Sequence, residues 1–353
     1  MIRVALIGCG AAAQQLHFPP LLTNRNVRLD WLVDTRLADV QKLSIRYGIK
    51  NVTDDYRQVR DVDAVIVATP HHLHAPIVEF FLQSGCHVLC EKPLDIRSEG
   101  ATRLVDLARD AKRVLAVGVF RRFYPSSMLG RNAVRTEWLG EIEQVDVEEG
   151  GSYLWDLQSL FMVQREKAGG GVLLDTGAHA IDRILWWFEG GEFDEIRYQD
   201  NSSTGVESDC ELNFMMNWRG RRIPVRVELS RTRTLRNTTR IIMARGTLEI
   251  PANRPCEALI LNQEFEADGC FAPLRMDLSS GCDPKENDVN TYFHVQLEEF
   301  QRAIEENAGC LNAGATTLPF ICLVEECYHN RTDLEEPWVT HGLNRFWLGE
   351  VSR

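Results

Sequence analysis

The chain has 353 residues, of which 44% are hydrophobic and 25% charged, and its formal net charge is −12. This length predicts about two domains, and the acidic balance argues against a broad nucleic-acid surface, which needs a basic face. No uninterrupted apolar run reaches the roughly 20 residues that cross a bilayer, and the opening "MIRVALIGCG" lacks the cleavage site of a signal peptide. We therefore expect a cytoplasmic protein that binds a small molecule, with neither nucleic acid nor a membrane as its partner.

The ten cysteines are scattered along the chain and form no Cys-x-x-Cys pair. A structural zinc site therefore has little support, and we expect no metal. In a reducing compartment most of these thiols should be free, and several should be buried as small hydrophobic side chains.

The first third of the chain alternates between short apolar runs and helical patterns. The runs are typical of buried strands, and amphipathic segments such as 74–85 and 98–111 lie between them. Alternation of this kind predicts a doubly wound parallel sheet with helices on both faces. The predicted strands are 3–7, 28–33, 63–69, 87–90 and 114–119.

A glycine motif follows the first predicted strand directly. Gly8, Gly10 and Ala13 match G-x-G-x-x-G/A, the pattern that lets a pyrophosphate approach the backbone at a helix start. Asp34 ends the second strand, where an acid binds the ribose hydroxyls of NAD and repels the 2′-phosphate of NADP. The sequence therefore favours NAD, although the nearby Arg36 keeps NADP as the less favoured alternative.

Two polar segments follow the third and fourth strands, at the sheet edge where ligands bind. They read "TPHHLHAP" (69–76) and "CEKP" (90–93). The histidines of the first segment lack a further ligand at metal spacing, so we expect one or two of them to touch the cofactor instead. In the second segment, Lys92 is either part of a salt-bridged surface turn or a site lysine at the edge of the sheet.

Residues 169–188, "GGGVLLDTGAHAIDRILWWF", predict one helix after a triple glycine. Asp175, His179 and Asp182 fall on one stripe of it. A structural reading has Asp175 complementing the helix dipole and Asp182 solvated with Arg183. Beside a dinucleotide domain, His179 suits the base that removes a hydroxyl proton near neutral pH.

With these motifs in place, the chain resembles the Gfo/Idh/MocA family of oxidoreductases, named after glucose-fructose oxidoreductase, inositol dehydrogenase and a rhizopine catabolism protein. The resemblance rests on "VALIGCGAAA", "VIVATPHHLHAPIVEFFLQSGCHVLCEKPL", "VGVFRRFYP" and "GGGVLLDTGAHAID", which occur in family order. It implies a Rossmann domain followed by an α+β domain, and it implies that the proline of E-K-P bends the chain, often through a cis peptide.

The resemblance also assigns roles to residues. His179 is implied as general acid/base, Lys92 as the group that contacts the reacting hydroxyl and tunes or relays its proton, and Asp175 as the residue that binds substrate hydroxyls. Glu91 either contacts the cofactor or orients the turn. The predicted cofactor-binding residues are Gly8, Gly10, Ala11, Ala12, Asp34, Thr69, Pro70, His71, His74, Glu91 and Lys92. The predicted substrate-binding residues are Lys92, Arg122, Tyr124, Trp155, Asp175 and His179.

Beyond residue 120 the pattern changes to strand-like alternation with turns, at 141–149, 209–218, 221–230, 238–250 and 256–265. The predicted organisation is a Rossmann domain over 1–120, an α+β domain with a largely antiparallel open sheet over 121–335, and a tail over 336–353. A helix over 290–307 is expected to pack back on the first domain. In the family the outer face of the sheet commonly forms dimers or tetramers, so a homodimer or homotetramer is expected.

Several functions fit these features. The leading one is NAD-dependent oxidation or reduction at a secondary alcohol of a sugar, inositol or sugar derivative. A second keeps NAD tightly bound in an internal redox cycle, with elimination of a glycosidic substituent or transfer between two substrates. A non-catalytic dinucleotide-binding regulator and the reduction of an imine or non-sugar carbonyl are further alternatives.

Overall fold

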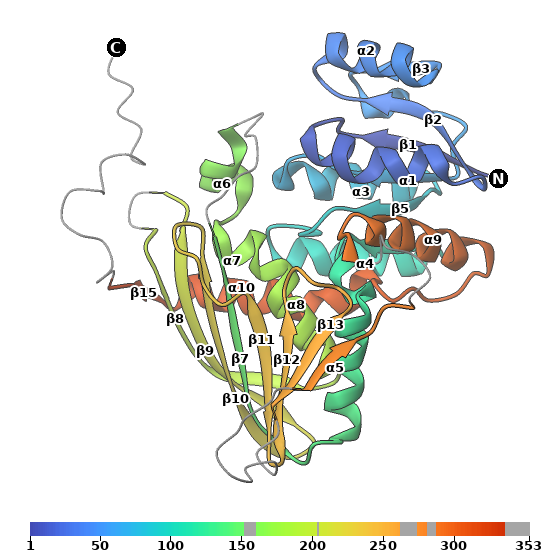
Figure 1. Cartoon of the computed structure of the whole chain (residues 1–353). Coiled ribbons are helices and arrows are strands. Elements are labelled where there is room, and N and C mark those ends of the chain that lie inside the picture. Colours follow the sequence, from blue (N-terminus) through green and yellow to red (C-terminus); the bar gives the residue numbers. More distant parts are fainter. Residues whose placement is uncertain (152–159, 203–204, 262–273, 281–286, 336–353) are drawn as a thin grey trace.

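The structure is a computed structural model that describes residues 1–151, 160–202, 205–261, 274–280 and 287–335. Two sheets dominate it, a parallel one built from the first third of the chain and a larger one built from the rest (Figure 1). Helices α7 and α8 lie where the two sheets meet (Figure 1). The predicted substrate-binding residue Trp155 and the predicted tail over 336–353 lie outside the described residues.

The parallel sheet has six strands in the order β3-β2-β1-β4-β5-β6. Its central strand β4 has four apolar residues that are all buried, as expected where helices cover both faces. The prediction of a doubly wound parallel sheet is thus confirmed, with one short strand, β3, that was not predicted. The strands are β1 (Ile2–Ile7), β2 (Val27–Val33), β3 (Asn51–Thr53), β4 (Ala64–Val67), β5 (His87–Cys90) and β6 (Leu115–Val117). The helices beside them are α1 (Phe18–Thr23), α2 (Leu37–Tyr47), α3 (His74–Gln83) and α4 (Ser98–Asp110).

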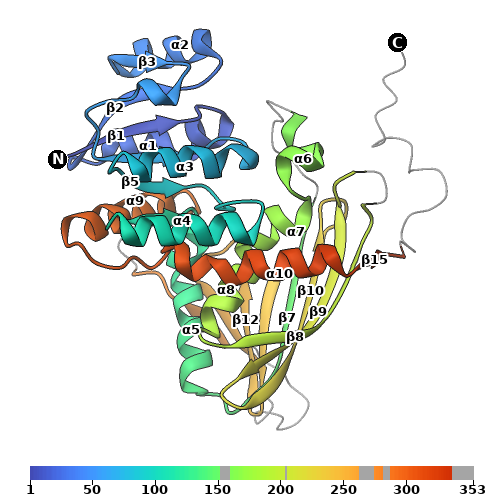
Figure 2. The same ribbon diagram turned by 180° about the vertical axis from the view of Figure 1, so that it is seen from behind.

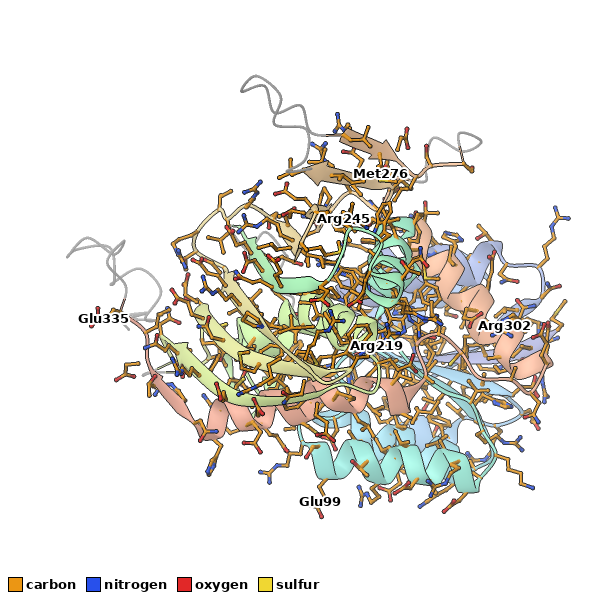
Figure 3. The ribbon with its side chains drawn as sticks, turned by 90° about the horizontal axis from the view of Figure 1, so that it is seen from below. Glu99, Arg219, Arg245, Met276, Arg302 and Glu335 are labelled. Carbon is orange, nitrogen blue, oxygen red and sulfur yellow. The ribbon has the colours of Figure 1, made fainter. Side chains whose placement is uncertain are left out.

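The second sheet has nine strands in the order β14-β13-β12-β11-β7-β10-β9-β8-β15. Figure 3 shows its two ends, marked by Met276 on β14 and by Glu335 just after β15. Most neighbours are antiparallel, but β10 pairs with β7 and β15 with β8 in parallel. The strands are β7 (Ile142–Gly150), β8 (Glu192–Asp200), β9 (Asp209–Trp218), β10 (Arg221–Ser230), β11 (Thr238–Met243), β12 (Gly246–Pro251), β13 (Glu257–Leu261), β14 (Leu274–Asp277) and β15 (Arg331–Asp333).

The largely antiparallel sheet was predicted, but two details differ. The single strand expected over 238–250 is a hairpin of β11 and β12, because the chain turns at Ala244 and Arg245. The edge strands β14 and β15 were not predicted, nor was β8, which pairs with β15. In β8 the residues are mostly exposed or half-buried, so the apolar alternation that reveals a strand is weak there.

Helices cover one face of the nine-stranded sheet. These are α5 (Pro125–Thr136), α8 (Gly177–Trp187) and α10 (Leu318–His329), and α10 also contacts α4 of the first domain (Figure 2). Their apolar side chains share one core with the inward residues of the strands, such as Leu212 and Phe214. Helix α9 (Thr291–Glu305) instead adds Leu297 and Phe300 to the core around β1. No helix in the described ranges is long and apolar enough to span a bilayer.

The predicted helix over 171–188 is in fact two, α7 (Val172–Asp175) and α8, with Thr176 between them. Asp182 and Arg183 are buried, with 2% and 0% of their surface exposed, and not solvated as one reading of the sequence had it. The break places Asp175 at the end of one helix and His179 in the first turn of the next.

Candidate active site

The glycine-rich turn after β1 has the shape that a dinucleotide requires. Gly8 has a φ of +89°, and a side chain there would overlap the carbonyl oxygen of Ala68. A Cβ at Gly10 would have as its nearest neighbour a guanidinium nitrogen of Arg36, 4.0 Å away, so the backbone stays open to an approaching phosphate. Ala11 and Ala12 open the helix that follows, and the first N–H groups of a helix favour an anion. These residues fit the pyrophosphate of NAD or NADP.

Asp34 lies where the sequence predicts it, directly after β2. Its carboxylate accepts the backbone N–H groups of Cys9 and Arg36, both at 2.9 Å. The guanidinium Nε of Arg36 lies 3.5 Å from the same carboxylate, on its Oδ1 oxygen. Asp34 therefore links the glycine-rich turn to the end of β2, and Arg36 partly balances its charge.

Neither among the histidines after β4 nor elsewhere in the described parts of the chain do three potential metal ligands form a cluster. His74 is fully buried, and its two ring nitrogens face the carbonyl oxygens of Thr69 and Pro93 at 2.8 and 2.6 Å. His71 donates from Nδ1 to the carbonyl of Ala168 at 2.7 Å, at the end of helix α6 (Arg165–Ala168). Both rings thus tie neighbouring segments together.

Thr69 and Pro70, in the same segment, follow β4 at the edge of the sheet where the cofactor is predicted to bind. Thr69 follows β4, next to the glycine-rich turn, with its Cγ2 3.0 Å from where a Cβ of Gly8 would lie. Its hydroxyl oxygen is buried and has no hydrogen-bond partner among the described residues. Pro70 precedes the short turn η3 (His71–Leu73). The unpaired hydroxyl of Thr69 fits the predicted contact with a dinucleotide.

Glu91 has a partner that sequence reasoning missed. His17 donates from Nε2 to its Oε1 at 2.7 Å. His17 ends the π-helical turn η1 (Ala13–His17), which continues the helix of the glycine motif. Burial would raise the pKa of Glu91, but the His17 hydrogen bond and the Lys92 charge outweigh it and leave the pKa below its ordinary value. The pair joins the cofactor turn to the turn that carries Lys92.

Lys92 lies in the site and not in a surface turn. Its peptide bond to Pro93 is cis, and its ammonium donates to the backbone carbonyl of Asp175 at 3.0 Å and to the Oδ1 of the same residue. The side chains are only 13% and 20% exposed. Burial raises the pKa of Asp175, yet the Lys92 and Arg231 cations hold it well below its usual range. Lys92 and Asp175 therefore form a partly buried ion pair between the two domains.

His179 lies beside this pair, on the first turn of α8. Its ring packs edge-on against Phe120 with 5.0 Å between the ring centroids, and its Nδ1 is buried without a partner among the described residues. Burial and the nearby Lys92 and Arg121 cations hold the pKa of His179 well below its ordinary value, while Asp175 opposes them. These effects favour the neutral imidazole of His179, which is the form that can accept a proton.

Arg122 has a different place from the predicted one. All five N–H donors of its guanidinium are used, on Asp182 (2.6 and 2.8 Å), the carbonyl of Leu311, and the hydroxyl and carbonyl of Thr316. It is 1% exposed, and so is the neighbouring Tyr124. With so little surface exposed, neither side chain is available to contact a substrate.

Arg121 is the neighbour that faces the site. Its guanidinium bonds both oxygens of Glu149 at 2.8 Å, and its charge acts on both Asp175 and His179. Its Nε is buried without a partner among the described residues. The sequence pattern pointed to Arg122, whereas Arg121, in the same turn η4 (Phe120–Phe123), is the arginine whose charge acts on Asp175 and His179.

The triple glycine is explained by Glu207, another residue that sequence reasoning missed. A side chain at Gly171 would overlap the backbone carbonyl of Glu207, and one at Gly170 would overlap the hydroxyl of Tyr328. The buried Oε1 of Glu207 accepts the N–H groups of Gly171 and Leu173 at 2.8 and 3.1 Å, and the hydroxyl of Tyr328 at 2.7 Å. Glu207 thereby anchors the start of the helix that ends in Asp175.

The chain matches two models of one family. Residues 2–119 match the NAD-binding Rossmann fold of the Gfo/Idh/MocA oxidoreductases, and residues 130–249 match the C-terminal domain of the same family. D-glucoside 3-dehydrogenase of Escherichia coli (strain K12) is 29% identical over 59% of this chain and 60% of that protein. Inositol 2-dehydrogenase of Rhizobium meliloti (strain 1021) is 30% identical over 51% of this chain and 53% of that protein. The matches thus span just over half the length of these curated relatives.

Solved structures agree over nearly the whole fold. A levoglucosan dehydrogenase in complex with NADH and levoglucosan gives a TM-score of 0.78 at 20% identity, covering 93% of this chain and 96% of that one. An aldose-aldose oxidoreductase from Caulobacter crescentus with glycerol gives 0.78 at 21% identity, covering 93% and 97%. At such identities the likeness shows the fold. Together with the two family models, it shows that this chain belongs to the Gfo/Idh/MocA oxidoreductase family, with an NAD(P)-binding Rossmann domain and the family's C-terminal domain.

Proposed function

We propose that this protein is an NAD-dependent dehydrogenase that acts on a secondary alcohol of a sugar, inositol or related polyol. The observation that carries the proposal is the meeting of Lys92, Asp175 and a neutral His179 at the edge of the sheet that bears the glycine-rich turn. Relatives that share the family are named for glucoside and inositol dehydrogenation. A regulator without catalysis has no need of this buried arrangement.

In the proposed reaction, a nicotinamide held at the glycine-rich turn would supply the hydride chemistry. The protein handles the proton. His179 accepts it from the substrate hydroxyl at its Nε2, since Nδ1 is buried. Lys92 uses two of its ammonium donors on Asp175 and directs positive charge at the oxygen that becomes negative as the proton leaves.

Asp175 balances two opposing requirements. A histidine whose pKa is strongly depressed stays neutral but is a weak base. The Asp175 carboxylate raises the pKa of His179 against the effect of burial and of Lys92 and Arg121. Asp175 therefore supports proton transfer through its charge and through its ion pair with Lys92.

NAD is proposed over NADP because of Asp34. A carboxylate at the end of β2 binds ribose hydroxyls and repels a 2′-phosphate. Arg36 already contacts the Asp34 carboxylate, so its positive charge is not free to bind a 2′-phosphate. Among the cofactor residues, Gly8, Gly10, Ala11, Ala12, Asp34, Thr69 and Pro70 lie where they can hold a dinucleotide, and Glu91 acts by orienting the Lys92 turn.

The test begins with the purified protein. It is denatured, and any released nicotinamide dinucleotide is identified by mass spectrometry, while absorbance at 340 nm is followed with NAD or NADP and a panel of polyols, sugars and sugar nucleotides. Lys92→Met and His179→Ala should each lower kcat by about 10²–10⁴-fold, the usual share of a positioned acid or base. Lys42→Met, on an exposed pair with Asp39, is the matched control.

Each outcome is informative. Turnover of NAD that both site variants abolish supports the dehydrogenase. Bound NAD without net NADH formation from any substrate favours the internal redox cycle. Failure to bind either dinucleotide contradicts the assignment of the glycine-rich turn.

The proposed assembly is a homodimer or homotetramer through the outer face of the nine-stranded sheet. The helices within the described ranges pack on the other face, and Met215, Pro224 and Ile242 are half-buried on the outer one. Each chain has a mass of 40.2 kDa. Light scattering that returns this single-chain mass at micromolar concentration would contradict the proposal.

A further inference from the structure

The carboxylate of Asp175 has a cation on each oxygen. Lys92, from the parallel sheet, bonds Oδ1, and Arg231, from the nine-stranded sheet, donates from Nη2 to Oδ2 at 2.8 Å. Arg231 follows β10 directly and is 13% exposed, as is Lys92. One buried carboxylate is thus held from both sides of the site.

Arg231 is itself well fixed. Its backbone N–H donates to the carbonyl of Ser208 at 2.8 Å, and its Nη2 also lies 3.4 Å from the carbonyl of Gly171. That carbonyl accepts the backbone N–H of Asp175 at 3.0 Å. The guanidinium therefore touches both ends of the single helical turn that presents Asp175.

The contact restricts a torsion that is otherwise soft. The carboxylate of an aspartate turns freely about its last bond, because that torsion has broad minima. A charge-assisted hydrogen bond from Arg231 to one carboxylate oxygen narrows that torsion. With Oδ2 fixed on Arg231, Oδ1 points at the ammonium of Lys92.

We propose that Arg231 is a positioning residue of this active site: by fixing one oxygen of Asp175 it holds the other on Lys92, and so keeps the lysine ammonium beside His179. Arg231 acts through Asp175 and not on the reacting atoms. The inference rests on the proposed function for its kinetic part, whereas its geometric part needs no substrate.

The kinetic test compares Arg231→Ala and Arg231→Lys with a control, Arg233→Ala. Arg233 lies on the same segment and bonds Asp209 and Glu228. Arg231→Ala should lower kcat by about 100-fold, the effect of a misplacement of about 1 Å, with the KM for NAD changed less than about threefold. Arg231→Lys should recover part of the loss, and Arg233→Ala should stay within about threefold of wild type.

The geometric test is a crystal structure of Arg231→Ala. The expected result is a rotated Asp175 carboxylate that has lost its contact with Lys92 Nζ. An unchanged Lys92–Asp175 contact overturns the proposal, and so does a kcat within threefold of wild type. An equal loss in Arg233→Ala, or a drop in melting temperature that accounts for the loss, assigns Arg231 a structural role instead. A wild-type protein that oxidises no substrate contradicts the proposed function, and the crystal structure still decides the inference.

Discussion

The cofactor side and the substrate side of the site are held by different kinds of bond. Around the glycine-rich turn the bonds involve the backbone: Asp34 accepts the N–H groups of Cys9 and Arg36, and Gly8 donates to Val33 at 2.8 Å. On the substrate side, side chains join segments far apart in sequence, as in Arg122–Asp182 and Lys92–Asp175. Substitutions should therefore act locally on the first side and on the stability of the whole fold on the second.

The largest effect on stability is expected at Arg122. Arg122→Ala leaves Asp182 buried without its ion-pair partner, which should lower the free energy of unfolding by about 3–5 kcal/mol. Urea denaturation measures this. Arg103→Ala, which breaks an exposed pair with Glu79, should cost less than about 1 kcal/mol. If Arg122→Ala costs as little free energy of unfolding as Arg103→Ala, the proposed contrast between the cofactor side and the substrate side is wrong.

A smaller effect on the free energy of unfolding, which depends on pH, is expected at His71. Burial lowers the pKa of His71 from 6.5 to about 3. The unfolded chain thus binds a proton between these values that the folded chain does not, so the folded state loses stability as pH falls from 6.5 towards 3. Thermal unfolding at several pH values measures how the free energy of unfolding depends on pH. In His71→Asn this dependence should be weaker, by at most about 1.4 kcal/mol per pH unit. The amide of asparagine keeps a donor for the carbonyl of Ala168.

The control for His71 is His329→Asn, the same change at an exposed position on α10. An unchanged slope in His71→Asn would mean that this histidine titrates alike in the folded and unfolded chain, and that the contact with Ala168 is not a persistent link between the two sides.

The smallest effect on stability is expected at Asp34. Asp34→Ala should weaken NAD binding by about tenfold, the loss of one or two charge-assisted hydrogen bonds, and raise the ratio of NADP to NAD affinity. Calorimetric titration of both dinucleotides checks this. Asp39→Ala, an exposed acid paired with Lys42, is the control. A large loss of stability in Asp34→Ala would show that the cofactor side also depends on long-range coupling.

The same contrast explains how much could be predicted from sequence. The parallel sheet, the glycine-rich turn and Asp34 follow from patterns within a few residues of one another. Arg231 and Glu207 could not be found this way, because their roles depend on Asp175 and Gly171, which lie 56 and 36 residues away in the chain. The charged pattern of Asp182 and Arg183 is typical of a solvated helix face, and only the partners Arg122 and Thr239 reveal that this face is buried.

The helix over 171–188 shows a second limit. Its apolar periodicity continues through Thr176, so periodicity alone predicts one helix. Tertiary contacts fix the start of the first helix, where Glu207 accepts the N–H of Gly171 and Arg231 contacts its carbonyl. The one signal in the sequence was the triple glycine itself, since three glycines before a helix indicate a close approach of other backbone or side-chain atoms.

The packing around those glycines has a consequence for anyone who wishes to redesign this site. Any side chain at 170 or 171 must displace Tyr328 or the backbone at Glu207. A library that varies the glycines alone will therefore return mostly misfolded chains, whereas one that varies 170 together with 328 leaves room for compensation. In a redesign, positions 170 and 328, and likewise 171 and 207, therefore have to be varied together. Such changes will also affect the helix that bears Asp175.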